Sequence, residues 1–117
     1  MTRARLRTFL QAAKKEYARY KSTRQEVYLA QAGEKLWNAY NMLLSIIAKT
    51  KIYNWKTAEK VSGELAVKYR DSNFIDVFAD TFELHKYFYR GHGKTEDEER
   101  RLVLSFELME KIMKKYI

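Results

Sequence analysis

Apolar residues along the chain recur every three or four positions, which is the period of an α-helix rather than of a β-strand. A first helix is expected at about residues 3–21, packed through one apolar stripe. That stripe contains Leu6, Phe9, Leu10, Ala13, Tyr17 and Tyr20. A second helix, at about 24–50, is so apolar in its second half that we expect it to lie at the centre of the fold. Its inward face contains Leu29, Leu36, Trp37, Tyr40, Leu43, Leu44 and Ile47.

Three further helices are expected at about residues 54–70, 73–90 and 95–117. The inward positions of the helix at 54–70 are Ala58, Val61, Leu65 and Tyr69. Those of the helix at 73–90 are Phe74, Val77, Phe78, Phe82, His85 and Phe88 or Tyr89. Those of the helix at 95–117 are Leu102, Phe106, Met109, Ile112 or Met113, and Tyr116. Connections of a few residues favour antiparallel neighbours. The pattern therefore predicts an all-α fold, an antiparallel up-and-down bundle of four to five helices, with residues 1–117 forming a single helical domain.

Polar residues at the expected helix starts indicate where the chain turns. Thr23 with Glu26, and Thr95 with Glu98, have the spacing of a capping box, in which both side chains bond to the first backbone amides. Residues 71–73 are all favoured N-cap types. We therefore expect side-chain caps at the second and fifth helices and a helix start next to residue 73.

Composition excludes several classes of protein. The chain has no cysteine, which rules out a disulfide framework, a thiolate zinc site and an iron–sulfur cluster. The longest apolar stretch, Met42–Ala48, is much shorter than a membrane span, and the arginine-rich start has no signal-peptide pattern. We expect a soluble, cytoplasmic protein with no membrane partner. The bias towards Lys, Glu, Ile and Tyr, with helix-surface ion pairs, hints at a thermophilic source.

Positive charge is concentrated at the start of the chain. Residues 1–24 contain eight basic residues and one acidic residue, a net charge of +7, whereas the other 93 residues have a net charge of +1. Such a basic helix attracts phosphates. The candidate nucleic-acid contacts are Arg3, Arg5, Arg7, Lys14, Lys15 and Lys21, together with Arg90 in the fourth helix. RNA is favoured over DNA. A solvated face that serves solubility and a surface for an acidic protein stay open as alternatives.

A second cluster of chemically capable residues ends the fourth helix. It consists of Phe82, His85, Tyr87, Phe88, Tyr89, Arg90 and His92. Histidine can transfer protons near neutral pH, and aromatic rings can stack on bases. His85 and His92 are therefore the candidate catalytic residues, although the position of His85 favours a hydrogen-bonded core or interface histidine. Two histidines and no glycine-rich phosphate loop predict neither a metal site nor a cofactor.

Two short motifs carry a family resemblance. The run Gln31–Ala39, followed about fifty residues later by Leu84–Tyr89, resembles the archaeal PaREP-type family, which is in turn similar to HEPN (higher eukaryotes and prokaryotes nucleotide-binding) domains. The resemblance covers about residues 24–115 and leaves out the basic first helix. It implies an antiparallel bundle that commonly forms a homodimer. The family's motif positions are Glu34, Trp37, His85, Phe88 and Tyr89.

The resemblance also implies a class of function. Many HEPN proteins are RNases or toxins whose signature is an arginine followed four to six residues later by histidine. Here the nearest arginine before His85 is Arg70, and Arg90 precedes His92 by two positions. The leading hypothesis is therefore a HEPN-like protein that binds RNA or nucleotides without being an enzyme, in a defence or toxin–antitoxin setting. The alternative is a non-catalytic protein–protein interaction module, and RNA cleavage by His85 or His92 comes third.

Overall fold

The chain forms five α-helices in a computed structural model that describes residues 3–91 and 93–117. They are α1 (Arg3–Thr23), α2 (Glu26–Ala48), α3 (Trp55–Tyr69), α4 (Asn73–Arg90) and α5 (Thr95–Tyr116). No strand occurs in the described ranges, which confirms the all-α prediction. None of these helices, over the part of the chain that is described, is both long and apolar enough to cross a membrane.

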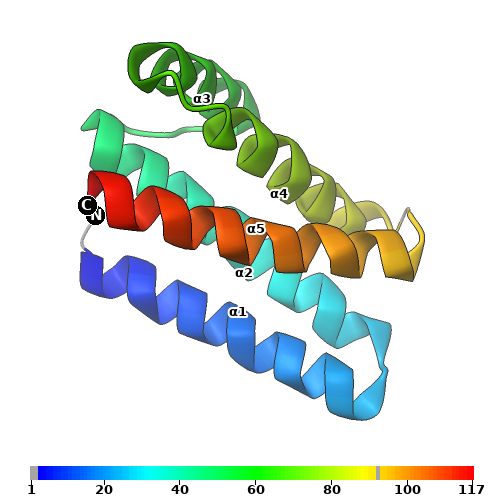
Figure 1. Cartoon of the computed structure of the whole chain (residues 1–117). Coiled ribbons are helices and arrows are strands. Elements are labelled where there is room, and N and C mark those ends of the chain that lie inside the picture. Colours follow the sequence, from blue (N-terminus) through cyan, green and yellow to red (C-terminus); the bar gives the residue numbers. More distant parts are fainter. Residues whose placement is uncertain (1–2, 92) are drawn as a thin grey trace.

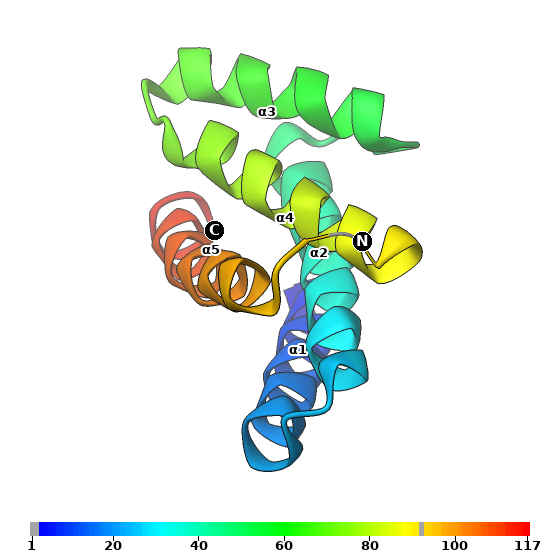
Figure 2. The same cartoon turned by 90° about the vertical axis from the view of Figure 1, so that its right-hand side faces the viewer.

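Helix α2 is the centre of the bundle, as its apolar sequence predicts. It packs against all four other helices. Figure 1 shows α1 lying along α2 in the opposite direction, and α4 and α5 also running in opposite senses. Helix α3 packs on α4 but crosses the end of α2 at a steep angle (Figure 2). The helix pairs α1–α2, α3–α4 and α4–α5 are therefore antiparallel hairpins. The α3–α4 hairpin lies across α2 rather than along it.

Tyr40 of α2 joins three helices in the core. Its side chain is fully buried. Its hydroxyl donates to the backbone oxygen of Phe74 in α4 at 2.8 Å and shares a hydrogen bond of 2.7 Å with the Ser62 hydroxyl in α3. Burial raises the pKa of Tyr40, so the phenol stays protonated. These two bonds satisfy the Tyr40 hydroxyl within the core.

Helix α4 turns a different face inward at its end than the sequence predicts. Phe88 and Tyr89 are exposed, so the expectation that one of them lies inward is wrong. Leu84 and Tyr87 are buried instead. Leu84 lies against Gly33 of α2, and α4 also packs against α5. The covered side of this last turn is therefore the side that faces α2 and α5.

Both predicted capping boxes are wrong. Helix α1 continues through Thr23, whose hydroxyl donates to the Arg19 backbone oxygen of its own helix at 2.8 Å. Thr95 is the first residue of α5, and its hydroxyl donates to Glu26 at 2.7 Å. Neither α2 nor α5 has a side-chain cap, because their N-cap residues are Gln25 and Lys94 rather than Thr23 and Thr95. The Thr95 hydroxyl joins the start of α5 to the start of α2 instead, whereas the Thr23 hydroxyl bonds within α1.

Tyr69 also departs from its predicted inward position. It is 38% exposed at the end of α3. Its ring packs against Tyr116 and Phe74, with centroid distances of 4.6 and 6.4 Å. The start of α4 is marked by Asp71, whose carboxylate accepts a hydrogen bond from the backbone N–H of Asn73 at 3.0 Å. The start of α4 thus lies where the sequence predicts it.

Candidate functional site

A close approach of α2 and α4 brings the two sequence motifs together. Gly33 of α2 lies so near Leu84 of α4 that a Cβ atom at Gly33 would be 3.0 Å from the Leu84 Cβ. A larger residue at this position would force the helices apart. The missing side chain therefore sets the spacing at which the neighbouring residues, Glu34 and His85, meet.

Glu34 and His85 form the polar contact between the motifs. The Nδ1 atom of His85 lies 2.7 Å from the Oε1 atom of Glu34. The side chains are 14% and 27% exposed, respectively. An ionised carboxylate only accepts hydrogen bonds, so the contact places a proton on Nδ1 and leaves Nε2 for another partner. The histidine is thus partly buried and hydrogen-bonded, in agreement with the sequence-based interpretation.

Aromatic rings pack around this pair. Trp37 stacks on His85 with a centroid distance of 5.1 Å, and Trp55 stacks on Phe82 at the same distance. Trp37 and Phe82 are themselves 5.7 Å apart. Tyr89 meets the edge of the His85 ring at 4.8 Å. Three helices therefore share one aromatic cluster, which orients the imidazole.

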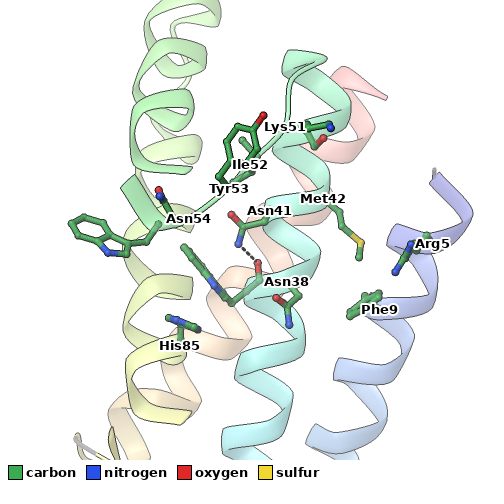
Figure 3. A pocket seen from close by; sticks show the side chains of 13 residues that line it. Arg5, Phe9, Asn38, Asn41, Met42, Lys51, Ile52, Tyr53, Asn54 and His85 are labelled. Carbon is green, nitrogen blue, oxygen red and sulfur yellow. Dashed lines mark hydrogen bonds between the residues drawn. The ribbon is translucent and has the colours of Figure 1, made fainter. Parts of the chain in front are cut away.

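The aromatic cluster borders a groove of about 970 Å³, called here the central groove. Figure 3 shows Arg5 and Phe9 of α1 on one side, His85 of α4 on the other, and Asn38 and Asn41 of α2 between them. The complete lining is Arg5, Phe9, Trp37, Asn38, Asn41, Met42, Ser45, Lys51, Ile52, Tyr53, Asn54, Trp55 and His85. Its volume lies in the range of pockets that take a small organic ligand.

Three kinds of chemistry meet in the central groove. Tyr53 and Trp55 present flat apolar surface, being 77% and 40% exposed. Arg5 and Lys51 supply positive charge. Asn41 donates one amide N–H to the Trp37 backbone oxygen at 2.8 Å, which leaves its side-chain oxygen as an acceptor. A planar ring that carries polar edges and an anionic group is the ligand that such a lining complements.

The predicted basic residues of α1 are all exposed, but they do not form one site. Arg3, Arg5, Arg7, Lys14, Lys15 and Lys21 reach solvent, and Arg5 is the one among them that lines the central groove. Lys14 forms an ion pair with Glu110 of α5 at 3.3 Å. Helix α4, which ends at Arg90, finishes at the opposite end of the molecule from the start of α1 (Figure 1). The structure therefore separates Arg90 from the basic candidates at the start of α1, Arg3, Arg5 and Arg7 (Figure 1).

The five family-motif residues come together in the structure. Glu34, Trp37, His85 and Tyr89 form a continuous cluster. Phe88 reaches it through Tyr89, with a centroid distance of 5.0 Å. His92 lies outside the described residues.

Several residues of the groove carry no signal in the sequence. Asn41, Lys51, Tyr53 and Asn54 match no motif, because only the packing of α3 across α2 brings them to one place. Asn38 lies within the motif run Gln31–Ala39. The burial of Glu16 in α1 was also missed, because the stripe around it is otherwise apolar. Its carboxylate forms an ion pair with the Lys35 ammonium group at 3.3 Å. Across the described positions, no group of three or more His, Cys, Asp or Glu side chains could hold a metal ion.

Comparison with known proteins identifies the family. The sequence pattern of the archaeal PaREP1/PaREP8 family matches residues 8–103. This range includes most of α1, so the expectation that the first helix lies outside the family region is wrong; Lys14, Lys15 and Lys21 are inside it. Neither the curated proteins nor the solved structures contain a significant match. Because the matched range spans most of the chain and contains both motifs, the chain belongs to the archaeal PaREP1/PaREP8 family.

Proposed function

We propose that this protein binds single-stranded RNA, or a nucleotide with the same chemistry, in the central groove. The observation that carries the proposal is the groove lining, which combines exposed aromatic rings, amide groups and cationic side chains. Aromatic rings can stack on the bases, amide groups can form hydrogen bonds with the bases and sugars, and cationic side chains can pair with the phosphates. The similarity of the family to HEPN domains, which the sequence resemblance implies, would favour the same class of ligand, and with it a homodimer acting in a defence or toxin–antitoxin setting.

The bases would stack on the exposed rings. Tyr53 is the most exposed large aromatic residue of the groove, at 77%, and Trp55 follows at 40%. One face of the Trp55 ring is occupied by Phe82. Stacking of a base on an aromatic side chain is worth about 1–3 kcal/mol and is available to every base. Binding at these two rings would therefore tolerate different sequences.

The phosphates would meet positive charge at the wall of the groove. Arg5 and Lys51 line it from α1 and from the segment that joins α2 to α3. Arg3 and Arg7 are exposed on the same helix as Arg5. Phosphate contacts of this kind release counterions, which makes the affinity strongly dependent on salt. Binding, rather than cleavage, is the function proposed, since no arginine has the signature spacing before His85.

The stacking role of Tyr53 provides the test. We would titrate a fluorescein-labelled single-stranded RNA with the protein and follow anisotropy. Tyr53→Ala should weaken binding about tenfold, because a stacking contact is lost. Tyr53→Phe keeps the ring and should bind like the unmodified protein. Absence of binding at low salt, or equal affinity for the alanine variant, would disprove the proposal.

A further inference from the structure

A second groove lies between α1 and α5, on a surface separate from the central groove. It has a volume of about 580 Å³. It is lined by Tyr17, Glu96, Glu99, Arg100, Val103, Leu104 and Glu107, and we call it the acidic groove. Long side chains bridge the two helices beside it: the Tyr17 hydroxyl donates to Glu99 at 2.8 Å, and Lys14 pairs with Glu110 at 3.3 Å. The groove is therefore held open by side chains rather than closed by helix packing.

The floor of the acidic groove is apolar. Val103 and Leu104 are 37% and 42% exposed in the middle of α5. They are adjacent in the sequence and lie opposite the buried side of the helix, which contains Leu102 and Ser105. Two aliphatic side chains exposed together within a groove are a surface on which another apolar group gains by burial.

Carboxylates flank this apolar floor. Glu96 and Glu107 are exposed, and neither forms an ion pair with any described residue. The positive charge of Arg100 is already matched by Asp97, at 2.7 Å. Glu99 is likewise paired with Arg24, at 3.8 Å. Glu96 and Glu107 are therefore the charges of the lining that no ion pair with a described residue matches.

We propose that the acidic groove binds a cationic amphipathic helix of a partner protein. Glu96 and Glu107 are eleven positions apart on α5, which spans about 16 Å, or about three helical turns. A docked helix that carries Lys or Arg at both ends and Leu-like residues between them would match both the charges and the floor. The proposal is independent of RNA binding, because the acidic groove shares no lining residue with the central groove.

A second copy of this chain fits the acidic groove less well. Its basic helix α1 would supply the charges. Its large aliphatic residues, Leu6 and Leu10, are however buried against α2 in their own bundle. The exposed side of α1 would therefore leave the Val103 and Leu104 floor uncovered. A separate partner that has both charge and apolar side chains is the better match.

The test uses a synthetic helical peptide with lysines at both ends and two leucines in the middle. Fluorescence anisotropy should show saturable binding to the complete protein. The double variant Glu96→Gln/Glu107→Gln should weaken it about three- to tenfold, as expected for the loss of two exposed ion pairs. Leu104→Ser should weaken it as well. The matched control Glu59→Gln/Glu64→Gln removes two exposed charges from α3 and should leave binding unchanged.

Three results would overturn the proposal. The first is the absence of saturable binding. The second is equal binding of a peptide in which glutamates replace the lysines. The third is self-association of the protein, seen by sedimentation and lost in Glu96→Gln/Glu107→Gln, without peptide binding; it would assign the groove to a second copy. RNA binding measured on the same variants should be unchanged, so failure here is distinguishable from failure of the RNA proposal.

Discussion

His85 is hydrogen-bonded through Nδ1 to Oε1 of Glu34, at 2.7 Å, although 51 positions separate the two residues in the chain. The bond joins α2 to α4 at the border of the central groove. Both side chains are partly buried, so each satisfies a polar group that packing withholds from water. Trp37 stacks on the same imidazole and fixes its plane. His85 is therefore a side chain whose position and ring plane are set by Glu34 and Trp37 of α2.

Removing the carboxylate should destabilise the fold. Glu34→Ala leaves the Nδ1 proton of His85 without its partner, which costs about 1–3 kcal/mol. Glu34→Gln keeps an oxygen that accepts this hydrogen bond and should cost clearly less. Urea unfolding followed by circular dichroism measures both. Equal stability of the alanine variant and the unmodified protein would show that the pair does not hold α2 and α4 together.

Replacing either of two glycines on neighbouring helices by alanine should change the stability of the fold in opposite directions. Gly33→Ala would place a Cβ 3.0 Å from Leu84 Cβ, so the helices must separate, at a cost of about 1–3 kcal/mol. At Gly63 in α3 a Cβ meets nothing within 4 Å. Gly63→Ala should therefore stabilise the protein by about 0.5–1 kcal/mol, through helix propensity alone. Thermal unfolding of the two variants compares them, and a stabilising Gly33→Ala would contradict the close approach of α2 and α4.

Tyr40 should be sensitive to the loss of one atom. Tyr40→Phe removes the hydroxyl that bonds to the Phe74 backbone oxygen and to Ser62, so two buried groups lose a partner. The expected loss is about 1–3 kcal/mol of unfolding free energy. Tyr53→Phe removes a hydroxyl from a residue that is 77% exposed and should change stability by less than about 0.5 kcal/mol. Chemical denaturation of both variants tests the difference, and equal effects would be the contrary result.

The fold should lose stability in acid through Asp71. Burial alone raises the pKa of this carboxyl, but hydrogen bonds from the Tyr116 hydroxyl and the Asn73 backbone N–H, with the charge of Lys115, bring the pKa below its ordinary value. The folded state therefore favours the ionised form. This stabilisation is complete above the unfolded-state pKa of about 3.9 and is lost as the pH falls through the lower folded-state value.

A variant isolates this contribution of Asp71. Asp71→Asn should be less stable than the unmodified protein at pH 6, and the difference should shrink as the pH falls from about 5 to about 2. Unfolding free energies measured at several pH values give the difference directly. A difference that stays constant, or grows in acid, would mean that the hydrogen bond from Tyr116, 2.7 Å long, does not favour the ionised carboxyl.

Sequence periodicity predicts the helices well because each apolar stripe marks the side of its helix that is buried in the core. Leu29, Leu36 and Leu43 lie on the expected inward face of α2 and are fully buried. The same reasoning fails where a helix end is covered from one side only. Phe88 and Tyr89 continue the apolar pattern of α4 but are exposed, since α2 and α5 cover the neighbouring side.

The candidate site was only partly visible in the sequence. Glu34, Trp37 and His85 belong to the two family motifs, and the structure brings them into contact. Lys51 and Tyr53 lie in the segment between α2 and α3, and their place in the groove follows from the crossing of α3 over α2. No local pattern encodes such a crossing. Glu16 was missed for a related reason, because its partner Lys35 lies on another helix.

The salt dependence of RNA binding tests the central claim most directly. Contacts from Arg5 and Lys51, the two cationic residues that line the central groove, would give a slope of about −1.4 in a plot of log affinity against log salt concentration. Lys51→Ala should reduce this slope by about 0.7 and weaken binding, whereas Lys60→Ala, an exposed lysine of α3 outside the groove, should change neither. Equal effects of the two variants, or no RNA binding at low salt, would contradict the assignment of the central groove as the RNA site.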